Sequence, residues 1–194
     1  MTLILASASA IRRSMLESAG VTVRCESPDV DEAAIKAAHE GDDSALAGAL
    51  AQAKALAIAS RPSGNWVIGG DSLVSVEGRR FDKPSDRADT EAHLRAFSGK
   101  TMTLTSAVCL ARDGVVDWSH AEAAQLHVRR FGDEFIHNYL DAEWPAVSYC
   151  VGVFRMEGRG IQLFDAVDGD HFTILGMPLL PLLGALRTRD LIDS

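Results

Sequence analysis

Apolar and polar positions along the first third of the chain predict a strand, a helix, a second strand and a long helix. Residues 2–6 form a short apolar run, and after a small polar loop the segment SMLESAG is typical of a helix that ends at Gly20. Residues 21–27 are predicted as the second strand. Residues 44–60 are rich in alanine, a strong helix former. Their apolar positions recur at helical spacing, at Leu46, Leu50, Ala53 and Ala57.

The later part of the chain mixes the same two kinds of element. Ser85 is predicted to cap a helix that stops before Gly99, and Asp113-Gly114 indicates a hairpin. The other expected elements are strands over 101–111, 115–128 and 161–167, and helices over 133–143 and 179–186. Strands and helices mixed in this way predict an α/β fold with a mixed sheet and flanking helices.

Length, composition and charge narrow the function classes. The 194 residues fit one domain with room for two lobes, and 47% hydrophobic and 24% charged residues are ordinary for a globular protein. A net charge of −8 argues against a protein that coats a nucleic acid polymer, because such binding depends on many Lys and Arg contacts to phosphate. The N-terminal run lacks a preceding basic region and is short. We therefore expect no signal peptide, no membrane span or membrane partner, and cytoplasmic residence.

Cysteine and histidine spacing gives no metal-binding pattern. Cys25, Cys109 and Cys150 are far apart and form no C-x-x-C, so we expect small core residues rather than a disulfide framework or a zinc site. The six histidines include no pair three or four residues apart, and we assign them no metal role.

The first loop has features of an anion-binding site. Small residues from Ser7 to Ser9 precede a helix start that carries Arg12 and Arg13, and helix N-termini attract phosphate oxygens. Arginine is not favoured by the helix dipole in a first turn, which suggests that the pair serves a ligand. The alternative is an ordinary N-cap serine followed by two solvated arginines.

Residues 66–84 place charged groups after an apolar strand. The strand begins at Trp66 and runs into Gly69-Gly70-Asp71, so we expect Asp71 at a strand end with backbone room around it. An aspartate in that position is also a common turn former or helix cap. Lys83 supplies a second charged group at the end of the stretch.

Two further charged residues complete the candidate set. Glu32 ends an acidic cluster of the kind that caps helices, although hard divalent cations are held by the same oxygens. Lys54 borders the apolar stripe of the alanine-rich helix. Its ammonium can reach either a cleft or solvent.

Six segments in order resemble the Maf family of nucleoside triphosphate pyrophosphatases, nearly from end to end. They are LILASASAIRRSML, the carboxylates ending at Glu32, Lys54 in its helix, GGDSLVSVEGRRFDKP, FSGKTMTLTSAVCL and CVGVFRMEGRGIQLFDAVDGDHFTILGMPL. The resemblance implies a two-lobed α/β fold like that of inosine triphosphate pyrophosphatases, with an active-site cleft between the lobes of one domain spanning residues 1–194. It also implies a divalent cation, Mg²⁺ or Mn²⁺, and hydrolysis of an acid anhydride that converts a nucleoside triphosphate to monophosphate and pyrophosphate.

The family's functional residues fall on matching positions of this sequence. The positions are Ser7, Ser9, Arg12, Glu32, Lys54, Asp71 and Lys83. The family's proline after the second serine is replaced by Ala10, and its Ala-Asp-Thr pattern by Gly70-Asp71-Ser72, which keeps the carboxylate and a hydroxyl. The expected roles are Asp71 as the base for the attacking water and, with Glu32, as metal ligand. The substrate-binding groups would be Ser7, Ser9, Arg12, Arg13, Lys54, Lys83 and Glu157.

Departures at three positions distinguish branches of the family. The branch that resembles dTTP and UTP pyrophosphatases has an arginine, a histidine and a glutamine where this chain has Ile11, Met102 and Glu157. The chain instead resembles the 7-methyl-GTP pyrophosphatase branch. A carboxylate accepts hydrogen bonds from guanine N1 and N2, whereas the carbonyl oxygens of uracil and thymine would oppose it. The alternative for Glu157 is a solvated turn residue.

Other functions stay open at this level. One is a dTTP or UTP pyrophosphatase of the same family, and another is a nucleotide-binding regulator of septum formation without catalysis. The sequence also leaves open whether the chain forms a homodimer.

Overall fold

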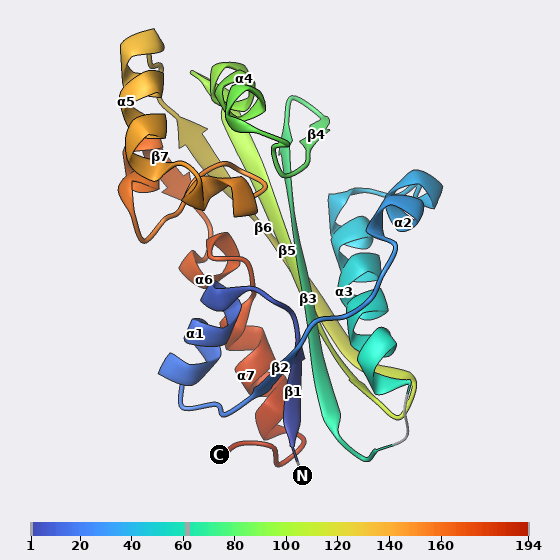
Figure 1. Cartoon of the computed structure of the whole chain (residues 1–194). Helices are drawn as coiled ribbons and strands as arrows, with labels where there is room; N and C mark the ends of the chain where they lie inside the picture. The colour runs from blue at the N-terminus through green and yellow to red at the C-terminus, as the bar shows by residue number, and fades with distance from the viewer. Residues whose placement is uncertain (1, 61–62, 194) are drawn as a thin grey trace. The chain divides into compact units, whose positions relative to one another are not determined.

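The computed structural model describes residues 2–60 and 63–193, and the chain divides into two compact units (Figure 1). Unit 1 comprises Met1–Ser72, Thr105–Glu122 and Asp170–Ser194, and unit 2 comprises Leu73–Leu104 and Ala123–Gly169. Each unit is therefore assembled from segments far apart in the sequence.

A mixed sheet of seven strands confirms the predicted α/β fold, with the order β2-β1-β3-β5-β6-β7 and β4 paired to β3. β1 pairs in parallel with β2 and β3, whereas β3–β4 and β6–β7 are antiparallel. The strands are β1 Leu3–Ala6, β2 Arg24–Glu26, β3 Trp66–Val76, β4 Arg79–Phe81, β5 Thr101–Arg112, β6 Val115–Val128 and β7 Phe164–Asp168.

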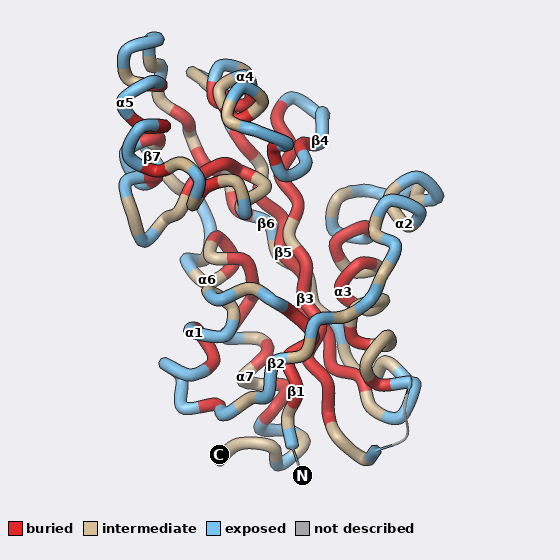
Figure 2. The backbone as a smooth tube through the Cα atoms, viewed as in Figure 1, coloured by how far each residue is buried: buried red, intermediate tan, exposed pale blue. Residues whose placement is uncertain are grey.

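Unit 1 packs helices on both faces of its strands. Its helices are α1 Ala10–Ser18, α2 Glu32–Ala38, α3 Asp43–Ala59, α6 His171–Ile174 and α7 Leu179–Arg187. On one face a core of buried side chains joins Leu5 and Ile68 of the strands to Leu16 of α1 and Leu182 of α7. α3 covers the opposite face (Figures 1 and 2). Buried side chains on both faces explain why β5 is buried almost continuously from Leu104 to Ala111 rather than on one side alone.

The buried face of α3 differs from the predicted apolar stripe. Leu46 and Leu50 are buried as expected, but Ala53 and Ala57 are partly exposed. The rest of the buried face is Ala47, Ala51, Ala55 and Ala59. A Cβ on Gly69 would lie 2.1 Å from the Ala51 carbonyl oxygen, so the helix backbone rests directly on β3 through its smallest side chains.

In unit 2 the elements confirm the predicted ones with shifted ends. Its helices are α4 Arg87–Phe97 and α5 Asp133–Glu143. Asp86 rather than Ser85 caps α4, because its carboxylate accepts a hydrogen bond from the Asp89 amide at 2.8 Å. The predicted strand over 161–167 begins only at Phe164, because residues Arg159–Leu163 form a 3₁₀ turn.

The hairpin between β5 and β6 is confirmed. Asp113 and Gly114 have φ of 48° and 83°, which is the left-handed pair that a two-residue hairpin turn requires. Only one of the three cysteines is the core residue expected: Cys109 is buried, whereas Cys25 is exposed and Cys150 partly exposed. Burial raises the pKa of the Cys109 thiol to about 12. None of the helices in the described part of the chain has the length and apolar character needed to span a bilayer.

Candidate active site

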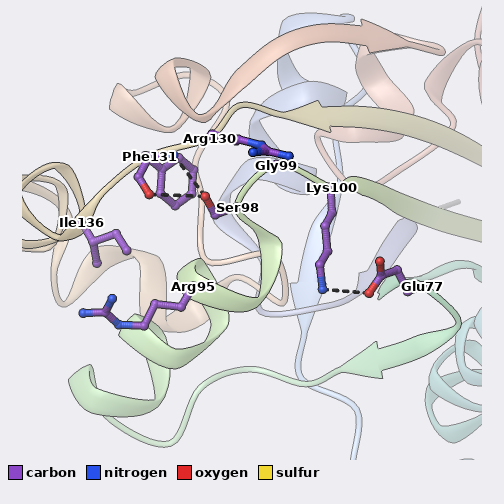
Figure 3. Close-up of a pocket in the computed structure, with 8 residues that line it drawn as sticks. All are labelled: Glu77, Arg95, Ser98, Gly99, Lys100, Arg130, Phe131 and Ile136. Atoms are coloured by element: carbon purple, nitrogen blue, oxygen red, sulfur yellow. Dashed lines mark hydrogen bonds and ion pairs between the residues drawn. The ribbon is translucent and has the colours of Figure 1, made fainter.

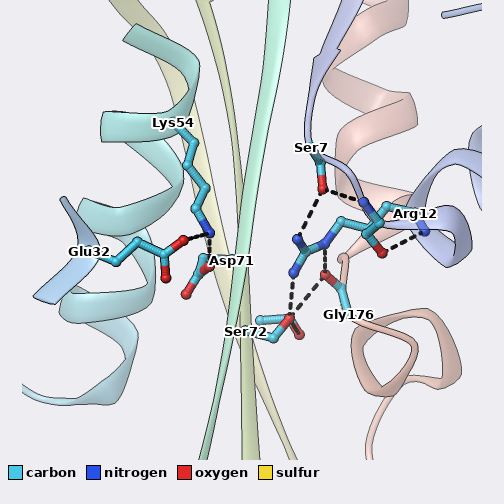
Figure 4. Close-up of polar contacts among 9 residues, drawn as sticks. Ser7, Arg12, Glu32, Lys54, Asp71, Ser72 and Gly176 are labelled. Carbon is cyan, nitrogen blue, oxygen red and sulfur yellow. Dashed lines mark hydrogen bonds and ion pairs between the residues drawn. The ribbon is translucent and has the colours of Figure 1, made fainter. Parts of the chain in front are cut away.

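Asp71 lies in the middle of a strand, not at the strand end that the sequence suggested. β3 continues to Val76, and Asp71 is buried, with 10% of its side chain exposed. Strand alternation sends Gly69 and Asp71 to the α3 face and Gly70 and Ser72 to the opposite face. Figure 4 shows the result: polar side chains gather on both sides of this one strand within unit 1.

On the α3 face Lys54 joins two carboxylates. Its Nζ lies 2.5 Å from Asp71 Oδ1 and 2.8 Å from Glu32 Oε1 (Figure 4). Lys54 reaches this point from α3, and 12% of its side chain is exposed; Glu32, the first residue of α2, is 43% exposed. The Asp31 carboxylate caps α2 by accepting from the Ala34 amide at 3.0 Å. An ion pair with so little water around it depends on good hydrogen bonding, because charges are costly to bury alone. The Lys54 ammonium therefore points toward Asp71 and Glu32 rather than into solvent, which is one of the two orientations that the sequence left open.

On the opposite face Arg12 is fixed by three oxygens. Its Nε donates to the Gly176 carbonyl at 2.8 Å, its Nη2 to Ser72 Oγ at 2.9 Å, and its Nη1 to Ser7 Oγ at 3.5 Å. The Arg12 side chain packs over Gly70, where a Cβ would lie in ordinary contact at 3.6 Å from Arg12 Nε. Burial lowers the pKa of Arg12, and the negative charges of Asp71 and Glu32 oppose that effect. A guanidinium remains charged at neutral pH, so the site keeps a positioned cation.

The hydroxyl groups of Ser72 and Ser106 connect Arg12 to the backbone at Thr173. Ser106 Oγ donates to the Thr173 carbonyl at 2.8 Å and lies 2.9 Å from Ser72 Oγ, and Ser72 Oγ in turn donates to the Gly176 carbonyl at 3.2 Å. Ser72 then offers a lone pair to Arg12. Thr173 Oγ1 in turn donates to Glu122 Oε2 at 2.7 Å.

These supporting residues were not found from the sequence. Ser72 stands next to Asp71 in a recognised pattern and could have been included. Gly176 and Thr173 reach the site through their carbonyl groups from distant parts of the chain, at sequence separations of 104 from Ser72 and 67 from Ser106. A backbone acceptor has no side-chain signature, so no residue pattern could have indicated it.

Two predicted substrate-binding residues lie at the edge of this cluster or outside it. Ser9 is the N-cap of α1: its hydroxyl accepts from the Arg12 amide at 3.4 Å, and its own amide donates to Ser7 Oγ at 3.1 Å. Arg13 points away, with 58% of its side chain exposed and Nε 2.7 Å from Glu17 Oε1. That hydrogen bond raises the pKa of Arg13. The structure thus places Glu32, Lys54 and Asp71 on one face of β3 and Ser7 and Arg12 on the other, and it brings Arg13 to neither group.

Lys83 and Glu157 belong to unit 2, and both are exposed. Both lie close enough to the Cys150 thiol for their charges to influence it. Burial is the largest cause of a raised pKa at Cys150, to which the charge of Glu157 adds and which the charge of Lys83 opposes.

A pocket of about 670 Å³ in unit 2 does not suit the same chemistry (Figure 3). The carboxylate in its lining, Glu77, is paired with Lys100 at 2.7 Å, and its Arg95 is paired with Asp133 and Glu91. The buried carboxylate of Asp71 and the guanidinium of Arg12, which is held by neutral oxygens, suit phosphate chemistry better.

Comparison with known proteins identifies the family of the chain. The model of the Maf-like protein family matches residues 2–189. The chain is 43% identical to the 7-methyl-GTP pyrophosphatase of Rhizobium etli, over 99% of this chain and 98% of that protein. It is 46% identical to the nucleoside triphosphate pyrophosphatase of Granulibacter bethesdensis, over 96% of each.

A more distant likeness links the chain to a solved structure, the nucleoside-triphosphatase / dITP/XTP pyrophosphatase of Mycobacterium abscessus. The TM-score is 0.42 with 19% identity, over 78% of this chain and 98% of that one. At this level the finer likeness to inosine triphosphate pyrophosphatases stays a prediction. The family match over nearly the whole chain does not depend on it, and the chain belongs to the Maf family.

Proposed function

We propose that this protein is a metal-dependent nucleoside triphosphate pyrophosphatase, a hydrolase of acid anhydrides, with 7-methyl-GTP as its preferred substrate. The observation that carries the proposal is the arrangement around β3, with the Asp71–Lys54–Glu32 cluster on one face and the fixed Arg12 guanidinium on the other. The relatives named as pyrophosphatases support the same reaction.

The donor set at Asp71 suits a hard divalent cation. One carboxylate oxygen of Asp71 and one of Glu32 lie within 2.8 Å of Lys54 Nζ. Among the described residues, no group of three or more His, Cys, Asp or Glu side chains could hold a metal ion. Mg²⁺ is commonly bound in this way, by one or two carboxylates together with waters and substrate phosphates. Asp71 and Glu32 would hold the ion, which would supply positive charge to neutralise the phosphates and to polarise the attacked phosphorus.

The side chains of the site would have two roles, phosphate binding and activation of the attacking water. Arg12 and Lys54 would neutralise triphosphate oxygens, with Ser7 and Ser9 as further contacts in unit 1. Substrate contacts from Arg13, and from Lys83 of unit 2, stay predictions from the sequence. Asp71 would orient a water molecule and take its proton as the water oxygen bonds to the α-phosphorus. The bond from the α-phosphorus to the bridging oxygen breaks, and pyrophosphate leaves with that oxygen.

A nucleotide panel tests the proposal. Purified protein is assayed with 7-methyl-GTP, GTP, dTTP and UTP, with Mn²⁺ or Mg²⁺ and with chelator. We expect monophosphate and pyrophosphate, the highest kcat/KM for 7-methyl-GTP, and loss of turnover with chelator. Higher kcat/KM for dTTP or UTP would place the chain in the pyrimidine branch. Nucleotide binding without pyrophosphate release would instead favour a regulator.

Replacing Glu157 by glutamine should move the preference toward pyrimidines. The carboxylate suits the N1 and N2 hydrogens of guanine and attracts the positive charge of 7-methylguanine, whereas an amide can donate as well as accept. A mispaired polar group of this kind shifts the ratio of kcat/KM by roughly 5- to 150-fold. The ratio of 7-methyl-GTP to UTP is measured, with Glu134→Gln on the exposed side of α5 as control. An unchanged ratio would remove Glu157 from base recognition.

A further inference from the structure

The segment that carries Glu157 is held in one shape by contacts within unit 2. Val153 has a φ of 52°, a left-handed conformation that is unfavourable for a β-branched residue, and it is fully buried. Tyr139 of α5 donates its hydroxyl hydrogen to the Val153 carbonyl at 3.0 Å. The Gly158 amide donates to the Arg155 carbonyl at 3.1 Å, and a Cβ on Gly160 would lie 2.5 Å from that same oxygen. The turn therefore has little freedom to change shape.

An ion pair between a partly exposed arginine and a buried glutamate ties the same segment to the end of α5. Arg155 Nε and Nη2 donate to one oxygen of Glu143, Oε2, at 3.1 and 2.9 Å. Glu143 is 5% exposed and is the last residue of α5, where the helix dipole disfavours a carboxylate. The hydrogen bond to Glu143 is the largest cause of a raised pKa at Arg155, and the charge of Glu157 adds to it.

Arg155 has two carboxylates near it but bonds to only one. Its guanidinium lies beside Gly158, where a Cβ would be 3.5 Å from Nη2, and Gly158 directly follows Glu157. Glu157 is exposed and makes no hydrogen bond or ion pair with another residue in the described part of the chain. The buried Glu143 carboxylate therefore holds Arg155, and the exposed Glu157 carboxylate stays available to bind a ligand.

We propose that Glu143 is a specificity-determining positioning residue, which holds Arg155 away from Glu157 and so keeps the Glu157 carboxylate free for the base. The inference rests on the proposed function, in which Glu157 recognises the base. Without the charge of Glu143, Arg155 would pair with Glu157, two residues away. The pair would occupy the carboxylate oxygens and place a cation beside the positively charged 7-methylguanine.

Glu143→Gln tests this inference, because it removes the charge and keeps the shape. The kcat/KM ratio of 7-methyl-GTP to UTP should fall about tenfold, the effect expected from one mispaired polar group. In the double variant Glu143→Gln/Arg155→Gln no cation remains to occupy Glu157, and the ratio should return to that of the wild type. A residue that merely stabilises the fold would give no such recovery. Glu143→Asp keeps the charge and should keep most of the preference.

A crystal structure of Glu143→Gln gives a readout that does not depend on activity. We expect the Arg155 guanidinium on the Glu157 carboxylate; Arg155 unmoved, or equal ratios in the single and double variants, would overturn the inference. If Glu143→Gln does not fold, Glu143→Asp decides, because its shorter side chain should loosen Arg155 partly. A small fall in the ratio together with Arg155 shifted toward Glu157 would support the inference, and a shifted Arg155 with an unchanged ratio would overturn it. Absence of pyrophosphate from every nucleotide with wild-type protein would refute the proposed function, and the position of Arg155 would still decide the inference.

Discussion

Replacing Asp71 by asparagine should lower kcat for pyrophosphate release by about 10³-fold, the loss expected when a positioned general base is removed. Asparagine preserves the shape of the side chain but cannot take a proton from water and is a poorer ligand for a hard cation. Lys54 keeps its 2.8 Å contact with Glu32, and Arg12 keeps its three oxygen partners on the other face of β3. Nucleotide binding should therefore remain measurable.

The measurement pairs kinetics with binding. Pyrophosphate release is followed with saturating Mn²⁺, and calorimetry with a nucleotide analogue that cannot be hydrolysed reports affinity. Asp165→Asn, on the exposed side of β7, is the matched control and should leave both quantities unchanged. Turnover of Asp71→Asn close to the wild-type rate would show that another group activates the water.

Replacing Gly69 by alanine should destabilise the protein by about 1–3 kcal/mol, the usual cost of overpacking a close contact. The new Cβ would lie 2.1 Å from the Ala51 carbonyl oxygen and 2.8 Å from Ala55 Cβ. A backbone oxygen cannot rotate away as a side chain can, so α3 must move off β3. Lys54 lies between these two alanines in the sequence of α3, and its contact with Asp71 should be lost with the shift.

Denaturant unfolding and kcat test that expectation together, with Gly48→Ala as the matched control. Gly48 lies in the same helix, and a methyl group added there would have nothing within 4 Å, so alanine should stabilise the protein by about 0.5–1 kcal/mol. Gly69→Ala with wild-type stability and activity would mean that α3 does not rest on β3 as closely as the structure shows.

The local elements can be predicted wherever the signal is local. Asp113-Gly114 determines its own turn, because few other pairs adopt two left-handed residues in succession. The apolar pattern predicts the buried face of α3 only in its first half, because alanines recur at every second position of the second half and do not distinguish one face of the helix from another. The prediction of Asp71 at a strand end is wrong, since two glycines suggest a break, whereas β3 continues through them and Gly69 admits the close approach of α3.

The site can be predicted as far as charged side chains identify it. Asp71, Lys54, Glu32 and Arg12 are all candidates from the sequence; the first three meet in unit 1, and Arg12 lies on the other face of β3, where their charges still influence it. The acceptors that aim Arg12, such as the Gly176 carbonyl, arise only when distant segments pack. Arg13 shares the charge and neighbourhood of Arg12, but one residue of helical rotation turns it to Glu17 and solvent.

The most direct measurement is the product stoichiometry from 7-methyl-GTP with and without divalent metal. The proposed reaction predicts one pyrophosphate for each 7-methyl-GMP, with neither product in chelator. Formation of the diphosphate with inorganic phosphate, or full turnover in chelator, would contradict metal-dependent attack at the α-phosphorus.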